Sequence, residues 1–246
     1  MKYRFRFQKS DLIVALLCCG FLVACLGAIG AGGKRRVKEA ICATNLRQWG
    51  HALLALAKDN GGYLMDRADA IYWFVTLEPY YTDRRLLLCP EATLAMYEGG
   101  SNPHLAWEIE GYSAYTGSYV TYKGSYVINL WIANEADPNK YWRTPYVAGA
   151  GNIPMMADGQ WKDMQPFPSD VPLPYEVSLW TPAADEMQRA CVNRHIGVNV
   201  LYLDGSVKKI GLKHLWVQRW YRGWEEDFAQ VGLPEWPEWV ADFKDP

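Results

Sequence analysis

The sequence has almost no net charge, because its 25 basic side chains are balanced by 27 acidic ones. A protein that binds nucleic acid through its bulk charge is strongly basic, so no nucleic-acid partner is expected. The chain also lacks a Gly-x-Ser-x-Gly elbow, a Walker loop and a dinucleotide-binding loop. With neither a nucleophile motif nor a cofactor motif, we predict that the protein is not an enzyme and uses no cofactor.

One long apolar run stands near the N-terminus, where residues 12–33 include no charged side chain. As a helix this run would measure roughly 33 Å, about the thickness of a bilayer core. Basic residues flank both ends, so their distribution does not set the orientation. The run predicts a basic tail (1–11), one transmembrane helix (12–33) and a domain (34–246) on the opposite side of the membrane, with the lipid bilayer as a partner.

A second interpretation of this run comes from Leu22-Val23-Ala24-Cys25, which resembles the lipobox of bacterial lipoproteins. In that case the mature chain would begin at a lipidated Cys25. Such a short motif also arises by chance in membrane helices rich in Ala and Leu, so both interpretations stay open. Each places the domain outside the cytoplasm.

An amphipathic helix is predicted over residues 34–60. Apolar side chains recur there at three- and four-residue spacing, charged and polar side chains occupy the other faces, and Gly61-Gly62 follows. Further along, Ser118–Ile132 is predicted to be a hairpin that turns at Lys123-Gly124. The strongest hairpin signal is Asp204-Gly205 between two strand-like runs.

Several short motifs together carry a resemblance to a known family. They are Cys42 with Asn45-Leu46-Arg47-Gln48, then Asp59-Asn60-Gly61-Gly62-Tyr63, then Cys89-Pro90, and finally His195 followed by Asp204-Gly205. The chain resembles type IV pilins and type II secretion pseudopilins that carry a prepilin-type N-terminal domain. The resemblance implies structural roles for the residues that match the family motifs, which are Asn45, Leu46, Pro90, His195, Asp204 and Gly205.

The resemblance also implies a fold, a function and a location. The fold would be α+β and pilin-like: a long N-terminal helix, half transmembrane and half amphipathic, packed on a small antiparallel β-sheet with a loop-rich C-terminal region. The function would be that of a structural subunit of a pilus, a pseudopilus or a type II secretion-like apparatus, single-pass in the inner membrane with a periplasmic or extracellular domain. Its partners would be copies of itself, other pilin-like subunits and secretion assembly proteins.

The boundary of the membrane run differs from the family pattern, because the Gly-Phe at which prepilin peptidase cuts is missing before Leu12. Asp11 is a candidate for the acidic residue that pairs with a neighbouring subunit, since a carboxylate at the edge of the hydrocarbon is costly unless paired. The same Asp11 also suits a helix N-cap. The alternative function is therefore an envelope protein of this fold that does not polymerise, held by the membrane helix or by lipid on Cys25.

The cysteines of the domain are Cys42, Cys89 and Cys191. In an oxidising periplasm Cys42 and Cys89 would form a disulfide; three separate buried thiols are the alternative. Cys191-x-x-x-His195 has the spacing of half a zinc site, but no second half with ligand-like spacing follows it, so no metal centre is predicted.

Calcium is a minor alternative, because Asp158, Asp163 and Asp204 offer oxygen ligands without the spacing of a known loop. For His195, the favoured role is structural, with its ring tying the chain to the turn at Asp204-Gly205.

Overall fold

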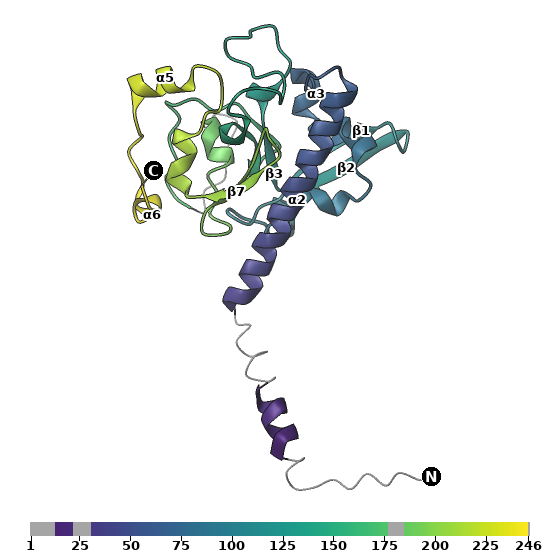
Figure 1. The fold of residues 1–246 in the computed structure, drawn as a ribbon, viewed down its shortest axis with the longest axis vertical. Coiled ribbons are helices and arrows are strands. Elements are labelled where there is room, and N and C mark those ends of the chain that lie inside the picture. Colours follow the sequence, from purple (N-terminus) through teal and green to yellow (C-terminus); the bar gives the residue numbers. More distant parts are fainter. Residues whose placement is uncertain (1–12, 22–30, 177–184, 246) are drawn as a thin grey trace. The chain divides into compact units, whose positions relative to one another are not determined.

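The structure is a computed structural model that describes residues 13–21, 31–176 and 185–245 (Figure 1). The chain divides into two compact units, Met1–Lys38 and Glu39–Pro246. Both sheets and the hydrophobic core belong to the second unit. The packing that forms the candidate site therefore lies within Glu39–Pro246.

The fold is α+β, with one long helix, several short ones and seven strands in the described residues. The helices are α2 (Ala31–Asp59), α3 (Arg67–Ile71), α4 (Trp73–Thr76), α5 (Trp224–Val231) and α6 (Glu238–Ala241). The strands are β1 (Trp107–Ser113), β2 (Ser118–Gly124), β3 (Tyr126–Asn129), β4 (Pro154–Asp158), β5 (Asp163–Met164), β6 (Val198–Tyr202) and β7 (Val207–Ile210).

The N-terminal part of the predicted fold is wrong. None of the helices in the described ranges is both long enough and apolar enough to cross a membrane. Residues 13–21, which lie in the predicted span, are helical. Helix α2 is long, yet its opening turns carry Lys34, Arg35, Arg36 and Lys38. The predicted pilin-like helix with a transmembrane first half is therefore not seen in the described residues, and Asp11 and Cys25 lie outside them.

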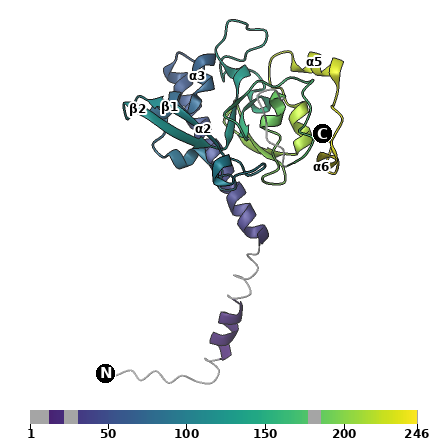
Figure 2. The ribbon, with the colours of Figure 1, turned by 180° about the vertical axis from the view of Figure 1, so that it is seen from behind.

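The strands form two sheets instead of one small antiparallel sheet. The larger has the order β5-β3-β4-β6-β7, in which β5 runs parallel to β3 and the other neighbours are antiparallel. The smaller is the β1–β2 hairpin. In both ribbon views this hairpin and the C-terminal helices α5 and α6 lie on opposite sides of the second unit (Figures 1 and 2).

The predicted hairpin over Ser118–Ile132 is also wrong. Strand β2 pairs with the preceding β1, and β3 belongs to the larger sheet. Gly124 is not a turn residue here: a Cβ on it would lie 2.3 Å from the Trp107 ring. The glycine is needed because an indole packs directly on the strand backbone.

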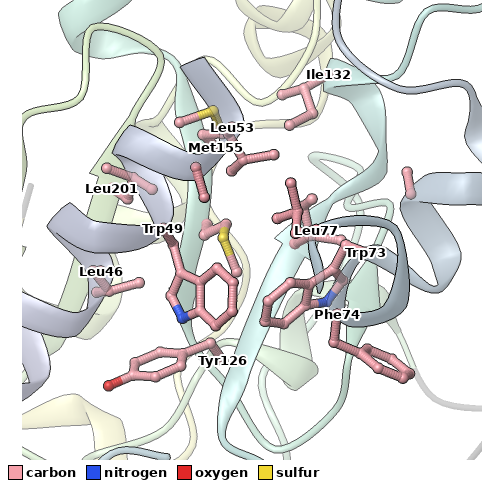
Figure 3. Packing of buried hydrophobic residues seen from close by; sticks show 14 of the residues in the cluster. Leu46, Trp49, Leu53, Trp73, Phe74, Leu77, Tyr126, Ile132, Met155 and Leu201 are labelled. Atoms are coloured by element: carbon pink, nitrogen blue, oxygen red, sulfur yellow. The ribbon is translucent and has the colours of Figure 1, made fainter. Parts of the chain in front are cut away.

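Helix α2 is held by its buried face. Leu46, Trp49 and Leu53 are fully buried against side chains of the larger sheet and of α4, including Trp73, whose ring meets that of Trp49 edge to face at 4.8 Å (Figure 3). Burying each such side chain stabilises the fold by about 1.5–3 kcal/mol. Gly61 and Gly62, both with positive φ, end the helix as the sequence predicted.

A second core lies around the C-terminal tryptophans. Trp216, Trp220 and Trp224 are buried with Trp131 and strand residues of β6. The side-chain amide of Asn129 donates to the carbonyls of Pro154 and Trp220, so the sheet and the tail share hydrogen bonds. These tryptophans therefore pack the tail onto the domain.

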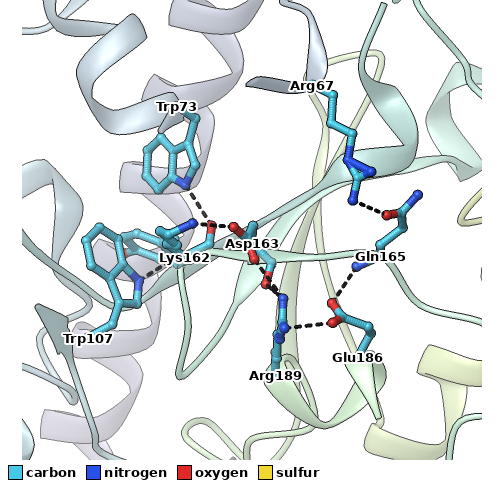
Figure 4. Close-up of polar contacts among 9 residues, drawn as sticks. Arg67, Trp73, Trp107, Lys162, Asp163, Gln165, Glu186 and Arg189 are labelled. Carbon is cyan, nitrogen blue, oxygen red and sulfur yellow. Dashed lines mark hydrogen bonds and ion pairs between the residues drawn. The ribbon is translucent and has the colours of Figure 1, made fainter. Parts of the chain in front are cut away.

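A buried ionic network connects β5 to the 3-10 turn at residues 186–189. Asp163 contacts Lys162 and Arg189, and Arg189 also pairs with Glu186 at 2.6 Å (Figure 4). The indole of Trp73 donates to the carbonyl of Lys162, which ties the network to α4. Because both cations already have carboxylate partners, this network is structural.

Candidate metal centre

Four side chains from distant parts of the chain meet in the core of the second unit. Cys42, Cys89, Asp158 and His195, here called the four-residue cluster, place one potential ligand atom each within 4.8 Å of one another. All four residues are buried, with at most 1% of the surface of any one exposed. Cys42 Sγ donates to Asp158 Oδ1 at 2.8 Å, and Cys89 Sγ lies 3.2 Å from His195 Nε2.

Helix α2 brings the two cysteines together. Cys42 lies on its buried face, one turn before Leu46. The side chains of Asn45 and Trp49 donate to the carbonyls of Leu88 and Leu86, so the segment that leads to Cys89 is fixed along the helix. Asn45, a motif residue in the sequence, thus contributes to the position of Cys89.

The other two side chains come from the larger sheet. Asp158 ends β4, and its Oδ2 accepts the backbone N–H of Asn199 at the start of β6. His195 precedes β6 at a sharp turn in which Ile196 (φ 56°) and Gly197 (φ 137°) both have positive φ. A β-branched residue in this region is strained, and a Cβ at Gly197 would lie 2.5 Å from the Ile210 carbonyl oxygen. The strained turn sets the direction from which His195 enters the cluster.

Arg194 fixes the backbone around the cluster. Its guanidinium is buried and donates to four carbonyls, those of Pro103, Leu105, Ser125 and Gly159. Gly159 follows Asp158 in the chain, and the Ser125 hydroxyl accepts the N–H of Cys89. Arg194 thus connects the backbone segments that carry three of the four cluster residues.

The cluster residues perturb one another electrostatically. Burial raises the pKa of Cys42, while the side-chain contact with Cys42, followed by the hydrogen bond with His195, lowers the pKa of Cys89. Burial acts to lower the pKa of His195, but the hydrogen bond with Cys89 and the charge of Asp158 outweigh it and raise the pKa overall. Cys89 is therefore the thiol that deprotonates first, and a thiolate is the form that binds metals.

A fifth polar group lies beside the cluster without a partner. Tyr126 is fully buried on β3 and is the cross-strand neighbour of Asp158. Burial raises its pKa, followed by the charges of Cys42, Cys89 and Asp158 and by the closeness of its hydroxyl to the Cys42 thiol. Its hydroxyl nevertheless has no hydrogen-bond partner, and nor does Nδ1 of His195. Buried polar groups are rarely left unpaired, so the Tyr126 hydroxyl points to an interaction that the protein chain alone does not supply.

The donor set suits a zinc-type ion. Two thiolates, an imidazole and a carboxylate are the ligands that bind Zn²⁺ tetrahedrally, at about 2.3 Å for sulfur and about 2.0–2.2 Å for nitrogen and oxygen. At these bond lengths the ligand atoms would stand about 3.3–3.8 Å apart. The hydrogen-bonded contacts of 2.8 and 3.2 Å are shorter than this, and other pairs extend up to 4.8 Å. Binding would therefore move the hydrogen-bonded pairs apart and draw the wider pairs together, by about 1 Å at most.

Comparisons with known proteins do not identify a family. No family model, no curated protein and no solved structure matches this chain. The candidate centre therefore rests on the geometry of the chain itself.

The structure places the predicted site residues in two groups. Cys42, Cys89 and His195 belong to the cluster, with Asn45, Leu46 and Pro90 on the adjoining helix and segment. Asp204 and Gly205 lie in the β6–β7 turn, at the far end of β6 from His195. The Asp204 carboxylate accepts the N–H of Ser206, so it does not form the predicted tie with the His195 ring.

The metal-ligand candidates considered from the sequence lie at different places in the fold. Cys191 is buried outside the cluster, where burial raises its pKa to about 12. Asp163 forms ion pairs with Lys162 and Arg189. Asp158, Asp163 and Asp204 therefore do not form the calcium site considered from the sequence. Asp158 lies with the two cysteines instead. The spacing of residues along the sequence did not predict this role, nor the roles of Arg194 and Tyr126.

Proposed function

We propose that the protein binds one divalent transition-metal ion of the zinc class through Cys42, Cys89, Asp158 and His195. The observation that carries this proposal is the convergence of four buried ligand atoms within 4.8 Å. The ion would tie helix α2, the segment after Leu88, strand β4 and the turn before β6 to one point. Its role would be to hold the α/β core together.

A structural role fits this geometry better than a catalytic one. Four protein ligands complete a tetrahedral shell, whereas catalytic zinc sites keep one position open for water or substrate. All four side chains are buried, so a substrate would have no access to the ion. The proposal thus retains the expectation that the protein is not an enzyme.

The charge of the surroundings supports a divalent ion. A divalent ion bound to two thiolates, a carboxylate and a neutral imidazole leaves one net negative charge. Arg194 is a buried cation that acts on the charge of Cys89 and, among the described residues, its guanidinium contacts backbone carbonyls only. It would balance that charge, which matters because an uncompensated charge in the interior is costly.

The predicted Cys42–Cys89 disulfide is the competing use of the same sulfurs. Both cysteines are free thiols in the structure, and both sulfurs belong to the cluster. A disulfide would leave Asp158 and His195 without their thiol partners, whereas a metal ion would use all four side chains. The arrangement of four donors therefore favours the metal, and the disulfide stays a prediction for oxidising conditions.

The proposal is tested by metal titration of the full chain, prepared metal-free under reducing conditions. In competition with a chromophoric chelator the protein should bind one equivalent of Zn²⁺. Cys89→Ala should weaken binding by at least about 100-fold, because the outer-shell changes alone cost about 10–100-fold and a lost ligand costs more. Cys191→Ala is the matched control and should bind as the wild type does. Equal binding by Cys89→Ala, or none by the wild type, would overturn the proposal.

A second candidate function is a structural subunit that assembles with copies of itself. The observation that favours it is a groove of about 890 Å³ beside α2, which has the partly exposed Ile41 on its lining together with Pro79, Tyr80, Leu86 and Pro90. A second copy of the chain would cover this side of α2, which carries both apolar and polar side chains. Ile41→Glu should then reduce the assembled fraction measured by light scattering, and a wild-type chain that stays monomeric at high concentration would contradict this candidate.

A further inference from the structure

Tyr126 extends the proposed metal centre. Its ring lies against the buried face of α2 beside Leu46 and Trp49, and its hydroxyl points along the helix toward the earlier turns (Figure 3). Cys42 lies in those turns, one turn before Leu46. Because Tyr126 and Asp158 are cross-strand neighbours on β3 and β4, both side chains reach the cluster from one face of the sheet.

The Cys42 thiol and the Tyr126 hydroxyl differ in their hydrogen bonding. The Cys42 thiol donates its only proton to Asp158, whereas the Tyr126 hydroxyl has no partner. In the metal-free protein Cys42 is therefore a hydrogen-bond donor. Its neutral sulfur is only a weak acceptor for the Tyr126 hydroxyl. Metal binding would change this, because the thiol proton would leave to solvent, the sulfur would hold the ion as a thiolate, and Asp158 would be free to act as a ligand.

We infer that the Tyr126 hydroxyl donates a hydrogen bond to the Cys42 thiolate in the metal-loaded protein and thereby strengthens metal binding. The inference rests on the proposed metal centre. It gives the unpartnered hydroxyl a role that appears only when the ion is bound. Tyr126 is thus a positioning residue, which orients a ligand without touching the ion. Outer-shell partners of this kind commonly change metal affinity by about 10–100-fold.

The test compares two buried tyrosines in the full chain. Tyr126→Phe removes the unpartnered hydroxyl. The matched control, Tyr202→Phe, removes a hydroxyl on β6 that donates to Gln218 away from the cluster. For each variant, Zn²⁺ affinity is measured by chelator competition, and the urea midpoint of the metal-free form is measured separately. The absorption of the Co²⁺-loaded protein reports on the bond from sulfur to metal.

Tyr126→Phe is expected to bind Zn²⁺ about 10-fold more weakly or worse, with an unchanged or higher urea midpoint when metal-free, because no hydrogen bond is lost in that state. Its thiolate-to-Co²⁺ charge-transfer band should shift to longer wavelength, since the sulfur electrons are less stabilised. Tyr202→Phe should show the reverse: a lower midpoint and normal affinity.

Two results overturn the inference while leaving the metal centre intact. One is wild-type affinity in Tyr126→Phe. The other is weaker binding together with a lower metal-free midpoint and an unshifted Co²⁺ band, which would assign Tyr126 a packing role. If the wild-type protein binds no Zn²⁺, the proposed function fails, and the role of Tyr126 fails with it.

Discussion

Zinc should stabilise the folded protein, and a single cysteine should account for the effect. The four ligands come from α2, the segment after Leu88, β4 and the turn before β6, so the unfolded chain cannot present them together. Binding to the folded state alone adds RT ln(1 + [L]/Kd), which is about 4 kcal/mol at a free zinc concentration 1,000 times Kd. With a urea slope of about 3 kcal/mol per M, the midpoint should rise by about 1.3 M.

The assay is urea unfolding under reducing conditions, with and without zinc, for the wild type, Cys89→Ala and Cys191→Ala. Both cysteines are fully buried, so each variant should lose a similar amount of metal-free stability, about 1–2 kcal/mol. Only Cys89→Ala should lose the zinc increment. A full increment in Cys89→Ala, or no increment in the wild type, would refute the reasoning.

Three further predictions follow from other parts of the domain. Burial raises the pKa of Asp170 from 3.8 to about 6, so its contribution to stability is present below about pH 4 and is lost as the pH rises through about 6. Asp170→Asn should therefore remove a decline of up to about 3 kcal/mol between pH 4 and pH 7, measured by urea unfolding; an unchanged pH profile would contradict it. Gly124→Ala should destabilise the protein by about 1–3 kcal/mol, because the new Cβ would lie 2.3 Å from the Trp107 ring; thermal unfolding with an unchanged midpoint would show that the ring moves freely. Arg194→Lys keeps the charge but cannot serve four carbonyls, so the free energy of unfolding should fall by about 2–4 kcal/mol, and wild-type stability would contradict the positioning role of Arg194.

Some features were readable from the sequence because they are local. The end of α2 at Gly61-Gly62 needs positive φ, and the β6–β7 hairpin turns at Asp204-Gly205, where Gly205 has a φ of 82°. The hairpin assigned to Ser118–Ile132 failed for a related reason. Gly124 was interpreted as a turn residue, but here glycine is required by the approach of Trp107. Sequence alone does not distinguish these two uses of glycine.

The candidate centre could be predicted only in part. Cys42, Cys89 and His195 stood out because they belong to short motifs. Zinc was not predicted, however, because no second pair of ligands with suitable spacing accompanies Cys191 and His195 in the sequence. The missing ligands come from other elements: Asp158 reaches the cysteines through the pairing of β4 with β3 and β6. Contacts made by sheet pairing leave no spacing signal along the chain.

The prediction of a membrane helix also failed for a physical reason. An uncharged run long enough to span a bilayer is necessary for a transmembrane helix but is not sufficient evidence of one. In the described ranges the long helix is α2, and its first turns carry a basic cluster. The run was assigned from its lack of charge and the amphipathic segment from its periodicity, and one continuous helix was inferred because the helical pattern follows the run directly.

The most direct test of the metal centre is X-ray absorption at the zinc edge of the loaded full-length protein. The cluster predicts a four-coordinate ion with two sulfur ligands at about 2.3 Å and two nitrogen or oxygen ligands at about 2.0–2.2 Å. A first shell without sulfur, or with a single sulfur, would contradict the assignment of Cys42 and Cys89 as ligands and with it the account of the site.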